Sequence, residues 1–308
     1  MLPPDLPPRL ARAMLEIYGE WGAAWLGVLP DLLADLAAQW GLTLGPPFPN
    51  LSYNYAAPAT RADGEAVVLK VGIPNRELLT EMAALDAYAG HGITRLLASD
   101  ADRGALLVER LLPGVPLASL TPGEDPRATT IAANVMRQLW RPAPADGPFP
   151  TVADWARGLE RLRAEFDGGV GPFPRRLVEQ AEALFADLLP SQTAPVLLHG
   201  DLHHENILSA TRAPWLALDP KGLVGEPAYE VGSLLRNPMP YLLAWPDLGR
   251  SLDRRVAQLA DELEMDKARL RGWGIAQAVL SGWWSYEDHG HGWEGALRIA
   301  ELLAGRGE

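Results

Sequence analysis

The sequence predicts an α+β protein with two lobes, a small N-terminal lobe built on a β-sheet and a larger, mainly helical C-terminal lobe. Two observations lead to this prediction. Strand patterns are concentrated between residues 48 and 112, whereas the rest of the chain shows mostly helical patterns. The length of 308 residues is also more than one ordinary hydrophobic core fills. Length therefore favours one large two-lobed domain or two ordinary domains, and the strand patterns place the boundary between 1–112 and 113–308.

The N-terminal lobe is predicted to begin with helices and to continue as a β-hairpin. Apolar residues recur every three or four positions from Leu10 to Trp40, which indicates two helices broken at Pro30. Residues 53–55 and 66–71 are typical of strands, and Asp63-Gly64 between them is typical of a hairpin turn. The patterns that follow predict a helix at 74–89 and strands at 93–98 and 105–112.

The C-terminal lobe is predicted to be helical except around one polar loop. Two short apolar segments, 196–198 and 215–218, bracket this loop and are typical of strands. Residues 141–150 contain four prolines and separate two helical patterns as a loop. The expected helices are 127–140, 152–166, 174–189 and a C-terminal set that contains Trp273, Trp283, Trp284 and Trp293.

Composition excludes several classes of function. The net charge of −12 repels nucleic acids and anionic membranes and favours a cationic partner. The chain has no cysteine, so disulfides, thiol nucleophiles and thiolate zinc sites are excluded. Residues 1–8 lack the pattern of a secretion signal, and no apolar run approaches the roughly 20 residues of a membrane span. We expect a cytoplasmic protein with no nucleic-acid or membrane partner; the sequence sets no oligomeric state.

The polar loop between the predicted strands carries the most specific functional pattern. It reads His-Gly-Asp, four residues and Asn, and a second Asp ends the next strand, which selects Asp201, Asn206 and Asp219. In phosphoryl transfer one carboxylate orients or deprotonates the attacking hydroxyl, while an amide and another carboxylate hold Mg²⁺ against the phosphates of ATP. Oxygen ligands suit Mg²⁺. The spacing therefore predicts a kinase that phosphorylates a hydroxyl group, with ATP and Mg²⁺ as cofactors.

Other interpretations of these residues stay open. His199, His203 and His204 lie close together, so a zinc site is one alternative, although Leu208 stands where a zincin-type helix needs its second histidine. A single carboxylate after a strand is commonly a turn former or a helix cap. A nucleotide-binding pseudokinase without turnover is another alternative, and the complete set of motif residues argues against it.

The segments 199–208 and 218–238 resemble the aminoglycoside phosphotransferase family, and within it the streptomycin 6-kinase and hydroxyurea kinase group. The second segment, LDPKGLVGEPAYEVGSLLRNP, carries the more specific likeness. The resemblance extends from about residue 40 to residue 294. It implies a protein-kinase-like fold, with a nucleotide-binding lobe at 1–112 that has a helical N-terminal extension and a catalytic and acceptor-binding lobe at 113–308.

The resemblance also implies roles for the residues of the polar loop and its surroundings. Asp201 is expected to be the catalytic base. Asn206 and Asp219 are expected to coordinate Mg²⁺. His199 is expected to order the loop through hydrogen bonds, and Glu230 resembles the acid that braces this loop from the next helix, a position where the wider family commonly has Asp.

Further implied roles concern nucleotide binding by the N-terminal lobe. Lys70 resembles the lysine that contacts the α- and β-phosphates. Its expected ion-pair partner is Glu81, with Glu77, one turn earlier, as the alternative. The backbone near Glu109 and Leu111 is expected to meet adenine at a hinge between the lobes. No glycine-rich loop precedes the lysine, so backbone amides and Ser52 are expected to contact the phosphates.

The acceptor is expected to be a small cationic molecule with a hydroxyl group. Residues 283–294 combine carboxylates with aromatic rings, which suits guanidinium or ammonium groups, and Glu287 and Asp288 are the candidate acceptor contacts. The tryptophans of this segment are also typical of a helical core. Because similar segments occur in streptomycin kinases, the expected acceptor is streptomycin or a related aminocyclitol. A housekeeping kinase of another small alcohol, amine or hydroxamate is the alternative.

Overall fold

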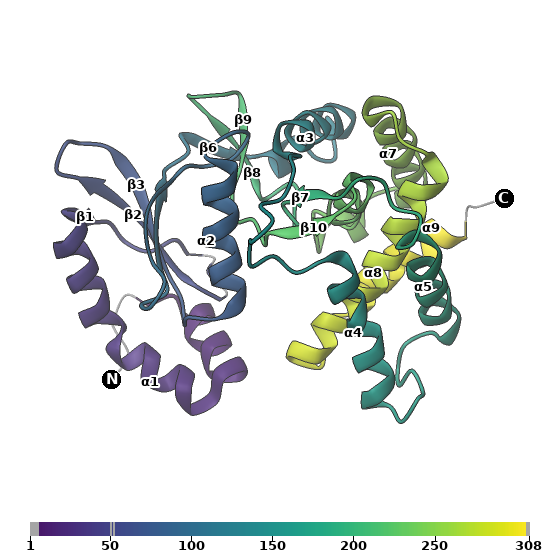
Figure 1. Ribbon diagram of the computed structural model, residues 1–308, viewed down its shortest axis with the longest axis horizontal. Helices are drawn as coiled ribbons and strands as arrows, with labels where there is room; N and C mark the ends of the chain where they lie inside the picture. The colour runs from purple at the N-terminus through teal and green to yellow at the C-terminus, as the bar shows by residue number, and fades with distance from the viewer. Residues whose placement is uncertain (1–5, 50, 52, 306–308) are drawn as a thin grey trace. The chain divides into compact units, whose positions relative to one another are not determined.

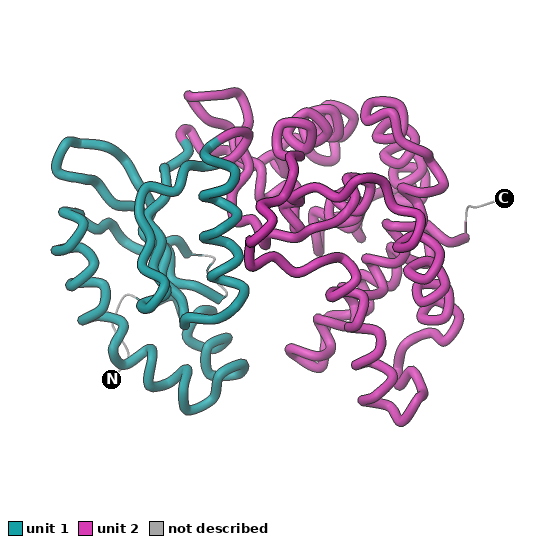
Figure 2. Tube along the Cα trace, viewed as in Figure 1, with its two compact units in different colours: residues 1–90, 94–111 teal, residues 91–93, 112–308 magenta. Residues whose placement is uncertain are grey.

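A computed structural model describes residues 6–49, 51 and 53–305, and the chain divides into two compact units (Figures 1 and 2). Unit 1 comprises residues 1–90 and 94–111, and unit 2 comprises residues 91–93 and 112–308. The sequence prediction sets the boundary after residue 112, one residue beyond the end of unit 1. Residues 91–93 belong to unit 2 because Gly92 accepts a hydrogen bond from the Ala217 N–H at 2.9 Å.

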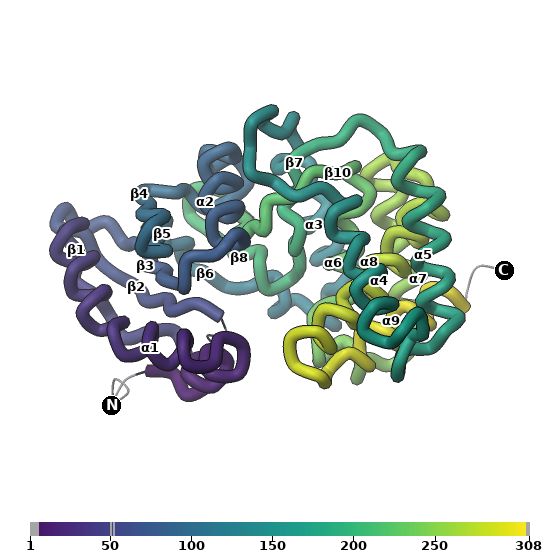
Figure 3. The backbone as a smooth tube through the Cα atoms, turned by 60° about the horizontal axis from the view of Figure 1, so that its bottom comes forward, coloured from purple at the N-terminus to yellow at the C-terminus, as the bar shows by residue number. Residues whose placement is uncertain are grey.

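In its described residues, unit 1 forms an antiparallel sheet of five strands with a helix on each side. The strand order is β1-β2-β3-β5-β4, and every neighbouring pair is antiparallel. Figures 1 and 3 both show α1 and α2 on opposite sides of this sheet. The elements are α1 (Pro8–Trp40), β1 (Leu42–Leu44), β2 (Tyr55–Arg61), β3 (Ala66–Val71), α2 (Arg76–Tyr88), β4 (Leu96–Asp100) and β5 (Ala105–Glu109).

Helix α1 departs from the predicted break at Pro30, which lies inside the helix. The backbone turns instead at Gly19, where φ is 54° and ψ is −127°. Glycine adopts a positive φ without strain because it has no Cβ. After the turn the two segments lie very close together, since a Cβ at Gly22 would stand 2.1 Å from the Met14 carbonyl oxygen. A proline inside a helix removes one helical hydrogen bond. The predicted break at Pro30 is wrong because the tertiary packing of α1 outweighs that loss.

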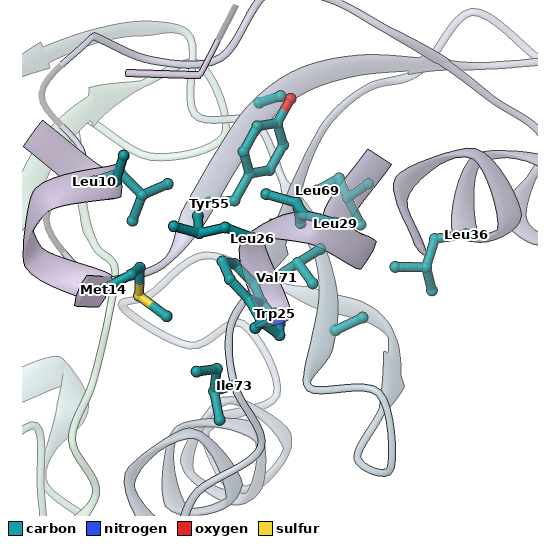
Figure 4. Close-up of a cluster of buried hydrophobic side chains, with 13 residues drawn as sticks. Leu10, Met14, Trp25, Leu26, Leu29, Leu36, Tyr55, Leu69, Val71 and Ile73 are labelled. Atoms are coloured by element: carbon teal, nitrogen blue, oxygen red, sulfur yellow. The ribbon is translucent and has the colours of Figure 1, made fainter. Parts of the chain in front are cut away.

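The core of unit 1 forms where α1 packs against one face of the sheet. Leu26 and Leu29 of α1 are fully buried, and so are Leu69 and Val71 of β3 (Figure 4). Successive residues of a strand point to opposite faces. Lys70, between these two buried residues, therefore lies on the other face of the sheet, the side of α2.

Unit 2, over residues 91–93 and 112–305, is mainly helical and contains two small antiparallel sheets. One sheet has the order β10-β7 and the other β6-β8-β9, and α8 contacts α4, α5, α6, α7 and α9. The strands are β6 (Pro113–Pro116), β7 (Val196–Leu198), β8 (Ile207–Ala210), β9 (Trp215–Ala217) and β10 (Leu223–Gly225). The helices are α3 (Asp125–Leu139), α4 (Val152–Glu165), α5 (Arg175–Leu188), α6 (Val231–Leu235), α7 (Leu248–Leu263), α8 (Lys267–His289) and α9 (Glu294–Ala304), with 3₁₀ turns η1 (Leu117–Leu120), η2 (Pro227–Glu230) and η3 (Tyr241–Ala244).

Four short strands, β1, β6, β8 and β10, are absent from the sequence prediction. Each has only three or four residues and pairs with a strand that lies elsewhere in the chain. Trp293 also precedes α9 instead of lying within it.

Among the residues that the structure describes, no helix combines the length and the hydropathy that crossing a membrane requires.

Two neighbouring leucines of α2 test whether the helix packs into unit 1 with one side buried and the other exposed. Leu78 is 3% exposed and Leu79 is 42% exposed. We expect Leu78→Ala to lower the free energy of unfolding by about 2–5 kcal/mol, because it removes buried methyl groups and leaves a cavity. Leu79→Ala, with the same change in helix propensity, should alter it by about 0.5 kcal/mol or less. Urea denaturation measures both values, and equal losses would contradict the packing described.

Candidate active site

The three residues of the predicted motif lie at one end of the sheet β6-β8-β9 and in the loop after β7. Asn206 immediately precedes β8, and Asp219 follows β9 by two residues. Strands β8 and β9 pair so that the Leu218 N–H donates to the Asn206 carbonyl oxygen at 3.0 Å. Asn206 and Asp219 are therefore neighbours at the end of this hairpin.

His199 connects the loop of Asp201 with the segment of Asp219. Its ring Nε2 lies 2.8 Å from the Leu218 carbonyl oxygen, and its Nδ1 accepts from the Asp201 N–H at 3.3 Å. Its own carbonyl oxygen accepts from the Lys221 N–H at 2.7 Å. Burial lowers the pKa of His199 to about 4, so the imidazole is neutral, and the two hydrogen bonds assign its proton to Nε2. The predicted ordering role of His199 agrees with these contacts.

Glu230 holds the backbone of the same loop. Its carboxylate accepts from the His199 N–H at 2.7 Å and from the Gly200 N–H at 2.9 Å, and the residue is 1% exposed. Burial raises the pKa of Glu230 to about 7, against the opposing effect of these hydrogen bonds. Gly200 has a φ of 85°, and a Cβ there would lie 3.1 Å from the ring of Trp155. The conformation of the loop therefore requires glycine at this position.

The Asp201 side chain is held from two sides. Its Oδ1 accepts from Arg236 Nη2 at 3.1 Å and from Ser233 Oγ at 3.3 Å. Its Oδ2 lies 3.6 Å from Nε2 of His203. Burial raises the pKa of Asp201, but His203 and Arg236 more than offset this effect and hold it well below its usual range. The carboxylate is therefore ionised, and 26% of the side chain remains exposed.

Sequence reasoning missed Ser233 and Arg236. Both belong to the segment that begins at Glu230, and the three residues recur at intervals of three. In a helix this spacing places side chains on one face. The spacing was visible in the sequence, but nothing local indicated that this face meets the loop of Asp201.

Asn206 and Asp219 provide oxygen ligands of the kind that Mg²⁺ prefers. Asn206 Nδ2 donates to the Asp201 carbonyl oxygen at 3.0 Å, which leaves the amide Oδ1 as an acceptor. Asp219 is exposed and has a φ of 58°, a left-handed conformation that is uncommon for a residue other than glycine. One amide oxygen and one carboxylate at neighbouring positions fit Mg²⁺ that is also bound to phosphate oxygens.

The zinc alternative finds no support in the geometry. His204 is buried with its Nε2 3.2 Å from Nη2 of Arg255, and burial lowers the pKa of His204 well below its usual range. The three histidines thus contact a carbonyl oxygen, a carboxylate and a guanidinium group respectively. Across the described ranges, no three His, Asp or Glu side chains are grouped so that they would hold a metal ion.

In unit 1 the predicted ion pair of Lys70 is confirmed, and its partner is Glu81. The Lys70 Nζ lies 2.6 Å from Oε1 and 2.8 Å from Oε2 of Glu81, and the two side chains are 12% and 8% exposed. The pair connects β3 with α2, since the two residues belong to these elements. A partly buried pair with two contacts to one ammonium group holds that charge in place.

Two other residues predicted to bind nucleotide, Glu109 and Leu111, lie at the end of β5 and two residues after it. The Glu109 N–H donates to the Arg95 carbonyl oxygen at 2.9 Å, and the Glu109 carbonyl oxygen accepts from Thr94 Oγ1 at 2.8 Å. Leu111 is 8% exposed. Ser52 lies outside the described residues.

The candidate acceptor residues lie at the end of α8. Glu287 accepts from Arg161 Nε at 2.6 Å and from Arg161 Nη2 at 2.9 Å, so its carboxylate already has a bidentate partner on α4. Asp288 is exposed. The ion pair of Arg161 with Glu287 borders a surface pocket of about 450 Å³. This pocket is lined by Arg161, Ala164, Glu165, Trp283, Tyr286 and Glu287.

Comparison with known proteins identifies the family. The model of the family described as aminoglycoside/hydroxyurea antibiotic resistance kinase matches residues 54–289. A streptomycin 6-kinase of Streptomyces glaucescens is 31% identical over 303 residues, which cover 98% of this chain and 97% of the relative. A hydroxyurea phosphotransferase of Kitasatospora aureofaciens is 31% identical over 304 residues, which cover 98% of this chain and 86% of the relative.

A solved structure shows the same fold. A thermostable mutant of aminoglycoside phosphotransferase APH(4)-Ia, in ternary complex with ADP and hygromycin B, aligns with a TM-score of 0.61 at 16% identity and covers 89% of this chain and 98% of that chain. The chain therefore belongs to the aminoglycoside/hydroxyurea antibiotic resistance kinase family, and the α+β, protein-kinase-like fold that its sequence predicts is confirmed.

Proposed function

We propose that this protein transfers the γ-phosphate of ATP to a hydroxyl group of streptomycin or a related aminocyclitol, with Mg²⁺ as cofactor. The observation that carries the proposal is the arrangement of three residues in unit 2: Asn206 and Asp219 lie at the end of the β8–β9 hairpin, and Asp201 lies in the loop after β7, where its carbonyl oxygen accepts from Asn206 Nδ2. Membership of a kinase family and a relative named as a streptomycin 6-kinase support it. The net charge of −12 favours a cationic acceptor.

Asp201 acts on the acceptor in this proposal. It accepts a hydrogen bond from the acceptor hydroxyl and orients that oxygen toward the γ-phosphorus. The acceptor oxygen forms a bond to phosphorus, the bond between phosphorus and the β,γ-bridging oxygen breaks, and ADP leaves. The hydroxyl proton passes to Asp201 and then to solvent. A carboxylate with a low pKa suits this task, because phosphoryl transfer depends more on orientation than on early removal of the proton.

Other residues of the chain bind the nucleotide. Asn206 and Asp219 would hold Mg²⁺, which when bound neutralises charge on the phosphate oxygens. The ammonium group of Lys70, held by Glu81, would contact the α- and β-phosphates. The backbone carbonyl oxygen of Glu109 would accept a hydrogen bond from adenine.

The contacts of the two candidate acceptor residues differ. A cationic acceptor that binds Glu287 must compete with the Arg161 guanidinium, which already makes two charge-assisted hydrogen bonds. Asp288 is exposed, so a cation can approach its carboxylate directly. Asp288 is therefore the better supported acceptor contact. A hydroxyurea-type acceptor is the second candidate function, because a relative of equal identity is named as a hydroxyurea phosphotransferase.

The choice of acceptor is tested by measuring ADP release with a coupled assay. The panel contains streptomycin, other aminocyclitols, hydroxyurea and small alcohols, each with ATP and Mg²⁺. We expect the highest kcat/KM with streptomycin, because its guanidinium groups complement an acidic protein. A higher value with hydroxyurea would support the second candidate. Binding of ATP without ADP release in any reaction would indicate a pseudokinase.

Substitution of the catalytic carboxylate should separate chemistry from nucleotide binding. We expect Asp201→Ala to lower kcat by about 10²–10⁴-fold. The affinity for ATP, measured by titration calorimetry, should change little, because other residues hold the nucleotide. Parental activity in this variant would show that Asp201 is not the base.

Asp219→Ala is the matched comparison, since it removes a carboxylate from the same site. This variant should weaken the binding of ATP in the presence of Mg²⁺ and raise the Mg²⁺ concentration needed for half-maximal activity. An unchanged dependence on Mg²⁺ would rule out metal coordination by Asp219.

The brace formed by Glu230 gives a stability prediction. Glu230→Gln turns an amide nitrogen toward one of the two backbone N–H groups, so the free energy of unfolding should fall by about 1–3 kcal/mol. Because the pKa of Glu230 rises from 4.5 to about 7 on folding, its contribution to stability is largest below pH 4.5 and is lost as the pH rises through 7. The excess of the parental Tm over the variant Tm should therefore shrink between pH 5 and 8. A difference that grows over this range would contradict the assignment.

A further inference from the structure

The C-terminal end of α6 reaches the catalytic carboxylate. Arg236 caps this helix, and its Nη2 donates both to Oδ1 of Asp201 and to Oγ of Ser233, at 3.1 Å each. Ser233 in turn donates to the same Oδ1 at 3.3 Å. The Arg236 side chain is 15% exposed and Ser233 is 1% exposed. The three polar groups form a closed triangle that is largely shielded from water.

The two carboxylate oxygens of Asp201 have different contacts. Both donors use Oδ1, whereas Oδ2 has His203 at 3.6 Å, which is an ion-pair distance but longer than a hydrogen bond. A carboxylate that is held only through Cβ rotates about its last bond with little resistance. Fixing Oδ1 stops this rotation and sets the direction of Oδ2.

Arg236 belongs to the same segment of chain as Glu230, which braces the loop. Glu230, at the start of this segment, accepts two backbone N–H groups of the loop that carries Asp201. Ser233 and Arg236 follow on the same face. One short stretch of chain therefore fixes both the backbone of the loop and the side chain at its tip.

We propose that Arg236 is a positioning residue, which fixes Oδ1 of Asp201 so that Oδ2 faces the acceptor hydroxyl. The inference rests on the proposed function of Asp201 and assigns a separate task to each of its oxygens. In this role the guanidinium of Arg236 orients the carboxylate of Asp201, and it contacts neither the acceptor nor the nucleotide. Errors of about 1 Å in such a constellation reduce rates by roughly 100-fold.

The kinetic test uses Arg236→Met and Arg236→Lys with the best acceptor of the panel. We expect Arg236→Met to lower kcat by about 100-fold, while KM for ATP stays near the parental value. Arg236→Lys keeps a donor and a charge, so it should recover part of the lost kcat. Ser233→Ala removes one of the two donors and should have a smaller effect in the same direction.

Arg271→Met is the matched control. Arg271 is 14% exposed in its side chain, lies in the same unit and pairs with Asp253 at 2.9 Å. Its replacement should lower Tm by an amount similar to that of Arg236→Met but leave kcat unchanged. A parental kcat in Arg236→Met, or equal losses of kcat in both variants, would overturn the positioning role.

A spectroscopic measurement keeps the inference testable even if no acceptor is found. The ¹³Cγ resonance of Asp201, assigned by comparison with Asp201→Asn, reports the hydrogen bonding of the carboxylate without any turnover. It should move in Arg236→Met and stay closer to the parental position in Arg236→Lys. An unchanged resonance in Arg236→Met would overturn the inference. An absence of phosphoryl transfer by the parent would count against the proposed function alone.

Discussion

The site in unit 2 depends on one buried carboxyl group, that of Glu230. A loop that leaves a strand and turns sharply at Gly200 exposes backbone N–H groups that no strand partner satisfies, and each such buried group costs about 1–3 kcal/mol when unpaired. Glu230 accepts two of them, from His199 and Gly200. The loop can therefore keep a conformation that presents Asp201, and the hydrogen bonds of His199 then join this loop to the segment of Asp219.

Charges in both units are held in place by protein groups before any ligand binds. In unit 1, Glu81 holds the ammonium group of Lys70 with two short contacts. In unit 2, Arg236 holds the carboxylate of Asp201, and His203 together with Arg236 holds the pKa of Asp201 well below its usual range. Such preorganisation matters in phosphoryl transfer, because the protein contributes mainly position and electrostatic stabilisation, and side chains that are already ordered need not reorganise during the reaction.

The catalytic motif and the candidate acceptor residues bear on two different properties of this protein, the type of reaction and the choice of acceptor. Relatives of equal identity to this chain are named for streptomycin and for hydroxyurea. Fold and catalytic motif alone do not select a substrate, and the two candidate acceptor contacts, Glu287 and Asp288, lie at the end of α8. There the Arg161–Glu287 pair neutralises one carboxylate and leaves Asp288 exposed, so the local charge differs from what composition alone suggests.

The sequence by itself determined the elements and residues whose signals are local. Periodicity was sufficient for β3 and α2, and the motif spacing was sufficient to select Asp201, Asn206 and Asp219 as one candidate site, because these signals lie within short stretches of chain. Only the tertiary structure decided the turn of α1 at Gly19, the short strands β8 and β10, and the contact of Arg236 with a carboxylate 35 residues away. These features arise when segments distant in sequence bury surface together and satisfy each other's hydrogen bonds, and no local pattern records which segments will meet.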